Sequence, residues 1–95
     1  MRYVADSFVE FMKALARALR ARRLGLGLTQ ERLAHEAGIS VRHYQLLESE
    51  EPSLGANPRC RTLYNIARVL KTDVAELVDP SRRSPATRRR APRRR

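Results

Sequence analysis

The side chains best suited to directional contacts with a ligand lie on one side of a short predicted helix. Arg42, Gln45, Leu46 and Ser49 recur at intervals of three and four residues, which places them on one helical face. A guanidinium and a carboxamide donate hydrogen bonds in fixed directions, so they suit planar acceptors such as base edges and phosphate oxygens. The chemistry that this face predicts is recognition, not bond-making.

A preceding helix and a tight turn are needed to position that face. Thr29 and Ser40 are helix-capping residue types, and each is followed by apolar residues at helical spacing. Gly38 stands where a left-handed residue ends a helix at little steric cost. The predicted inner faces consist of Leu33, Ala34, Ala37, Tyr44 and Leu47. Two short helices joined in this way form a helix-turn-helix, so the range 29–48 predicts a DNA-reading element.

The composition bounds the rest of the chain. Its 95 residues, 42% of them hydrophobic, suffice for one small domain with a modest core. A lone cysteine excludes an internal disulfide, and no apolar run approaches ~18 residues. We therefore expect a soluble cytoplasmic protein, associated with the nucleoid. The net charge of +10 divides into +3 over residues 1–78 and +7 over residues 79–95, so a mildly basic domain carries a strongly basic arm.

Further helices flank the central pair. Ser7 and Glu10 have capping-box spacing at the start of an amphipathic helix that Gly25 and Gly27 end. Another helix is expected to begin near residues 57–58, with Cys60 as a buried, inert thiol on its inner face. Lys71 follows that helix at a position that favours glycine.

The last short helix is expected to start at Thr72 as its cap and to stop at residues 79–80. Val74 and Val78 on it either form a dimer surface or complete the core. The prediction is thus an all-α bundle of about five short helices. Residues 1–6 form a flexible N-terminus, residues 7–79 the helix-turn-helix domain, and residues 80–95 a disordered Arg-rich tail. The tail serves either as a polyanion-binding arm or as a solubilising segment.

Several runs resemble the Cro/lambda-repressor, or XRE, type of helix-turn-helix protein. They are LTQERLAHEAGIS at 28–40, YQLLE at 44–48, NPRCRTLYNIARVL at 57–70 and TDVAEL at 72–77. The resemblance covers roughly residues 8–78. It implies a compact bundle of five helices in which the second and third bind DNA.

This resemblance also implies site residues. Val41, Arg42 and Leu46 correspond to positions that approach base edges in the major groove. The implied phosphate or secondary contacts are Gln30, Ser40, His43, Gln45, Arg59 and Arg61. Simpler alternatives remain for several of them, since Leu46 fits a protein contact, His43 a solvated surface, and Gln30 a plain helix start. Arg23 and Glu48 correspond to an ion pair that ties the first helix to the recognition helix.

One segment departs from the family pattern. Between Ser49 and Asn57 the loop is longer by roughly four residues, and no glycine comes before Gly55. Glu50 and Glu51 add acids close to the expected DNA surface, where they would repel phosphates. This departure puts the usual contacts between loop and phosphate in doubt.

Nothing in the sequence indicates catalysis. His35, His43 and Cys60 are too few and too scattered for a metal site, and no nucleophile motif or phosphate loop appears. We expect no enzyme activity, no cofactor, no small-molecule substrate and no membrane contact. The expected function is sequence-specific binding of double-stranded DNA by a homodimeric, repressor-type regulator. The alternatives are an antitoxin or restriction-modification controller of the same fold, or a non-catalytic module that binds a partner protein and contacts nucleic acid through its tail.

Overall fold

The fold is a bundle of five helices in the part of the chain that the structure, a computed structural model, describes: residues 7–51 and 57–79. The helices are α1 (Phe8–Gly25), α2 (Gln30–Ala37), α3 (Val41–Glu48), α4 (Cys60–Val69) and α5 (Val74–Val78). No strand is found in these ranges, which confirms the all-α prediction. The predicted flexible N-terminus, the predicted disordered tail and most of the lengthened loop lie outside the described residues.

Three of the predicted N-terminal caps are confirmed. The Ser7 hydroxyl accepts a hydrogen bond from the Glu10 backbone N–H at 3.1 Å, and Thr29 and Ser40 accept equivalent bonds at 3.0 and 2.9 Å. Each bond satisfies an N–H that has no partner inside its own helix. Gly38 ends α2 in the left-handed conformation, with φ 77° and ψ 29°, as the sequence predicts.

The second half of the chain differs from the prediction. Helix α4 begins at Cys60, later than expected, after Arg59, whose side chain makes no capping bond. Cys60 has the phase of the inner stripe but is exposed, because it stands at the first residue of α4 and nothing in the described chain covers it. Asp73, not Thr72, caps α5, since the Asp73 carboxylate accepts from the Glu76 N–H at 2.9 Å.

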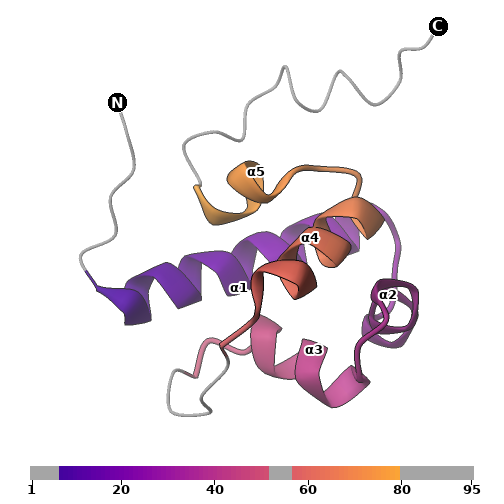
Figure 1. The fold of residues 1–95 in the computed structure, drawn as a ribbon, viewed down its shortest axis with the longest axis horizontal. Helices are drawn as coiled ribbons and strands as arrows, with labels where there is room; N and C mark the ends of the chain where they lie inside the picture. Colours follow the sequence, from indigo (N-terminus) through magenta and orange to yellow (C-terminus); the bar gives the residue numbers. More distant parts are fainter. Residues whose placement is uncertain (1–6, 52–56, 80–95) are drawn as a thin grey trace, which may run out of the picture.

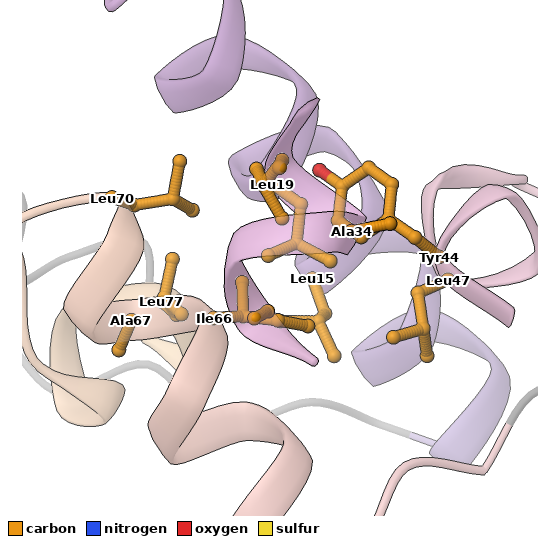
Figure 2. Close-up of a cluster of buried hydrophobic side chains, with 11 residues drawn as sticks. Leu15, Leu19, Ala34, Tyr44, Leu47, Ile66, Ala67, Leu70 and Leu77 are labelled. Atoms are coloured by element: carbon orange, nitrogen blue, oxygen red, sulfur yellow. The ribbon is translucent and has the colours of Figure 1, made fainter. Parts of the chain in front are cut away.

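All five helices contribute to one hydrophobic core. Figure 2 shows side chains from each helix converging between α1 and the helices around it. The residues are Leu15, Leu19, Leu33, Ala34, Ala37, Tyr44, Leu47, Ile66, Ala67, Leu70 and Leu77. Val74 and Val78 are half-buried and pack against this cluster, which supports their assignment to the core.

The helices pack in a closed series, each chiefly against two others. In Figure 1, α3 lies below α1 and α5 above it, and both helices contact α1. Helices α2 and α3 follow each other at a sharp angle, and α4 packs against α2 and α5. No helix among the described residues is long and apolar enough to cross a membrane. This arrangement leaves the side of α3 that faces away from α1 uncovered by any other described helix.

Candidate nucleic-acid interface

The recognition face predicted from the sequence lies on α3, with its two most polar members in solvent. Arg42 and Gln45 are exposed, whereas Val41, His43 and Leu46 are half-buried. Tyr44 and Leu47, on the opposite side of α3, are fully buried in the core. The helix is therefore held by its apolar side and presents a guanidinium and a carboxamide to solvent.

The buried end of α3 is fixed by an ion pair to α1. Arg23 Nε donates to Glu48 Oε2 at 2.6 Å, and Nη2 donates to Glu48 Oε1 at 3.1 Å. The same guanidinium donates through Nη1 to the Leu28 carbonyl at 2.8 Å, in the connection between α1 and α2. Arg23 and Glu48 are, respectively, 7% and 9% exposed. One arginine thus links α1, the following connection and α3 through bonds with little access to water.

Further donors complete the environment of the Glu48 carboxylate. The Tyr44 hydroxyl donates to Oε2, and the Gln30 carboxamide donates to Oε1 at 3.0 Å. Burial alone would raise the pKa of Glu48, but hydrogen bonds from Arg23, Tyr44 and Gln30 lower it below its ordinary value. Burial and the bond to Glu48 raise the pKa of Tyr44, and the bond to Glu48 raises that of Arg23. Glu48 is therefore an ionised, fully paired carboxylate.

Gln30, at the first residue of α2, is held between two residues of α3. It donates to Glu48, as above, and its carbonyl oxygen accepts from Gln45 Nε2 at 3.3 Å. The exposed Gln45 is thereby connected to the buried ion pair through one intervening side chain. The side-chain order Gln45, Gln30, Glu48, Arg23 runs from the recognition face to α1.

The remaining predicted contact residues are exposed near the starts of α3 and α4. Ser40 is exposed and caps α3, while Arg59 and Arg61 are exposed at and just after the start of α4. Glu50 is directed toward α1, where its carboxylate lies 3.1 Å from Arg17 Nη2. Its charge is thus compensated, which lowers the repulsion that the acidic segment was expected to exert on phosphates. Glu51 is exposed, and its backbone N–H donates to Ser49 Oγ at 3.1 Å.

A second clamp, between α1 and α5, was missed by reasoning from the sequence. Arg22 Nη2 donates to Glu76 Oε1 at 3.0 Å, and the Thr72 hydroxyl donates to the same oxygen at 2.7 Å. Arg22 and Glu76 are 54 positions apart, so no local pattern connects them. The only local signal was Glu76, an acid three residues after Asp73. An acid at the start of a helix is equally well explained by its interaction with the helix dipole.

No metal site is apparent in residues 7–51 and 57–79, where no group of three histidine, cysteine or acidic side chains could hold an ion. The most buried ion pairs of these ranges are Arg23–Glu48 and Arg22–Glu76, and Gln30 connects Glu48 to Gln45. Their chemistry is that of orientation and hydrogen bonding.

Comparison with known families identifies the class of protein. A helix-turn-helix family model matches residues 19–77, which is more than half of the chain and spans the end of α1 through α5. The chain belongs to the helix-turn-helix family of the Cro/lambda-repressor, or XRE, type. No solved structure matches it. As a member of this family the chain is a DNA-binding regulator whose ligand is double-stranded DNA.

Proposed function

We propose that the chain is a sequence-specific regulator that occupies promoter DNA as a repressor, with α3 in the major groove. The observation that carries this proposal is the division of α3 into a fully buried side, with Tyr44 and Leu47, and an exposed side, with Arg42 and Gln45. Because its buried side is packed into the core, α3 has a fixed orientation relative to the rest of the domain. Direct reading of bases requires a helix that is held in this way.

Arg42 is the residue that we assign to base recognition. Its guanidinium is exposed at the second residue of α3 and suits paired donation to guanine O6 and N7. Val41 and Leu46, both half-buried, offer apolar surface to thymine methyl groups beside it. The pattern favours a half-site in which a guanine and thymines are neighbours.

Phosphate contacts would set the register of α3 on the duplex. We assign the phosphate or secondary contacts to Gln30, Ser40, His43, Gln45, Arg59 and Arg61. Compensation of Glu48 by Arg23 and of Glu50 by Arg17 supports this assignment, because the acids closest to α3 then repel phosphates weakly. In the same proposal the Arg23–Glu48 pair acts by orienting α3 relative to α1.

The wider proposal follows the family. A homodimer would bind a palindrome whose half-sites are about one helical turn apart, in the cytoplasm and on the nucleoid. The Arg-rich range 80–95 would add sequence-independent attraction to phosphates, because all of its charged side chains are arginines. An antitoxin or a restriction-modification controller of the same fold would share this DNA interface.

The test is selection of bound sequences from a randomised duplex library at near-physiological salt. A recovered motif, above all a palindrome, is the expected result and would give the half-site spacing. Recovery of unrelated sequences by folded protein would contradict sequence-specific reading. It would favour the interaction-module alternative, in which a partner protein is the specific ligand.

Replacement of Arg42 sharpens that test. In Arg42→Ala, preference for the correct base at one position per half-site should fall by about 1–3 kcal/mol, roughly 5- to 150-fold. Arg68→Ala is the matched control, since Arg68 is an exposed arginine on α4, next to Tyr64 and outside the recognition face. Equal binding of Arg42→Ala to every single-base variant of the site, at the wild-type ratios, would remove Arg42 from base recognition.

A further inference from the structure

The buried carboxylate of Glu48 receives only hydrogen-bond donors from the described residues around it. Arg23 Nε and the Tyr44 hydroxyl donate to Oε2, while Arg23 Nη2 and Gln30 Nε2 donate to Oε1 at 3.1 and 3.0 Å. Arg20 adds a further cation, with its Nη1 4.0 Å from Oε1. An ionised carboxylate accepts hydrogen bonds but cannot donate one. Glu48 therefore requires that Gln30 turn its amino group, and not its carbonyl oxygen, toward the ion pair.

This orientation of Gln30 fixes the orientation of Gln45 in turn. With its amino group directed at Glu48, Gln30 presents its carbonyl oxygen to Gln45, whose Nε2 donates to it at 3.3 Å. Gln45 is exposed and makes no other side-chain hydrogen bond to the described residues. Its free edge consists of one N–H, a donor, and the carbonyl oxygen, an acceptor. A buried carboxylate thus determines which groups an exposed amide of the recognition face presents.

A donor and an acceptor side by side match one purine in the major groove. Adenine presents N7, an acceptor, beside its N6 amino group, a donor, whereas guanine presents two acceptors, N7 and O6. In the orientation that Gln30 imposes, Gln45 can pair with adenine but would direct its carbonyl oxygen at an acceptor of guanine. Gln45 lies three residues after Arg42 on the same face of α3, so both side chains can reach the same groove.

We propose that Glu48 is a positioning residue for base recognition, which acts through Gln30 to make Gln45 select adenine over guanine. The inference rests on the proposed function, because it requires α3 to lie in the major groove. It moves Gln45 from the secondary contacts to the base-reading residues. The ion pair with Arg23 then does more than hold α3 against α1, since it keeps a group that can only accept at the buried end of the row.

The substitution Glu48→Gln should reverse this row of side chains. Arg23 Nε and the Tyr44 hydroxyl both donate at the Oε2 position, so the amide oxygen of the new side chain should take that place. Its amino group then faces Gln30, which turns its carbonyl oxygen inward and its own amino group toward Gln45. Gln45 accepts that bond and keeps N–H donors at its free edge, which suit the two acceptors of guanine.

The experiment measures binding of the full chain to the selected site and to its single-base variants. The wild type should prefer adenine over guanine at one position per half-site by roughly 5- to 150-fold, and Gln45→Ala identifies that position by losing the preference. Glu48→Gln should lose or invert the preference there and keep the preferences at the other positions. Glu76→Gln is the matched control, because Glu76 is also a buried carboxylate, 7% exposed, that pairs with an arginine of α1.

Two results for these variants would overturn the proposal. One is weaker binding of Glu48→Gln to every sequence with all base preferences kept, because Glu48 would then only stabilise the fold. The other is the same change of preference in Glu76→Gln, because any loosened clamp would then have this effect.

A second variant interrupts the row and keeps the buried ion pair. Gln30→Ala should also lose the adenine preference at the position that Gln45→Ala identifies, and it decides the matter if urea unfolding shows that Glu48→Gln does not fold. An unchanged adenine preference in Gln30→Ala would overturn the connection between Glu48 and Gln45.

Failure of this inference and failure of the proposed function give different results. If the wild type selects no motif from the library, sequence-specific reading fails and the inference falls with it. If the wild type selects a motif in which no adenine depends on Gln45, the proposed function stands and the inference alone fails.

Discussion

Two helix pairs of this protein, α2–α3 and α4–α5, share two structural features, a left-handed turn residue and an arginine–glutamate contact to α1. The two pairs differ in how well these features are satisfied. In each pair a left-handed residue follows the first helix, Gly38 at φ 77° and Lys71 at φ 60°. Each pair is also tied to α1 by an arginine–glutamate contact, Arg23 to Glu48 and Arg22 to Glu76. Consecutive arginines of α1 thus reach α3 on one side and α5 on the other, which agrees with the positions of these helices in Figure 1.

The difference lies in how fully each device is satisfied. Arg23 makes a bidentate contact and also bonds to the Leu28 carbonyl, whereas Arg22 contacts one oxygen and its Nε is buried without a hydrogen-bond partner among the described residues. At the turns, glycine adopts φ > 0 without strain, but lysine pays about 1–2 kcal/mol for it. The α2–α3 pair therefore has the more fully satisfied contacts of the two, and we expect α4–α5 to unfold locally first.

The largest expected effect comes from breaking the complete clamp. Glu48→Ala should lower the free energy of unfolding by about 3–5 kcal/mol, because it leaves the Arg23 guanidinium buried without its counter-charge. Glu76→Ala should have a smaller effect, about 1–3 kcal/mol, since fewer bonds to Arg22 are lost. Urea unfolding at neutral pH measures both. Equal losses for the two variants would contradict the ranking of the clamps.

The pH dependence of stability should identify the same carboxylate. Because folding lowers the pKa of Glu48, its contribution is fully present above its unfolded value near 4.5 and is lost as pH falls through the folded pKa. The stability of the wild type should thus fall more steeply below pH 4.5 than that of Glu48→Ala. Parallel curves for the two proteins would mean that another group controls acid unfolding.

These comparisons also separate what the sequence could predict from what it could not. Helix caps and turns could be predicted, because each depends on residues within a few positions of each other. The examples are the caps at Thr29 and Ser40 and the turn at Gly38. The partners of Arg22 and the exposure of Cys60 depend on where whole helices meet. Nothing near Arg22 in the sequence indicates Glu76 as its partner. The face of α3 followed from spacing, whereas the row Gln45, Gln30, Glu48 needed the relative placement of α2 and α3.

A substitution at each left-handed residue tests the second device. Gly38→Ala should destabilise the protein by about 1–2 kcal/mol through backbone strain alone, because nothing lies within 4 Å of the added Cβ. Thermal or urea unfolding gives the change. A neutral result would mean that the α2–α3 turn relaxes to a conformation with negative φ.

The reverse substitution is Lys71→Gly. It should raise the free energy of unfolding by about 1 kcal/mol, because glycine adopts a positive φ without the backbone strain of lysine. Lys71 is exposed, so the loss of its side chain removes little packing. A more stable Lys71→Gly variant together with a less stable Gly38→Ala variant would support the interpretation that the turn at Lys71 is strained and the turn at Gly38 is not. Loss at both positions would mean that the Lys71 side chain stabilises the turn in a way that outweighs its backbone.

The smallest expected effect concerns the uncapped start of α4. Arg59 holds the extended conformation of a capping residue, at φ −76° and ψ 158°, yet makes no capping bond. Arg59→Ser should therefore raise stability by about 0.5–1 kcal/mol, as the new hydroxyl accepts from a first-turn N–H. If Arg59 contacts a phosphate, the same variant should bind all DNA sequences more weakly, with a salt dependence shallower by about one counterion. If Arg59→Ser is more stable but binds DNA more weakly, the arginine at the start of α4 contributes to DNA binding at the cost of a helix cap. Equal affinity and salt dependence would leave the missing cap without a functional reason and remove Arg59 from the interface.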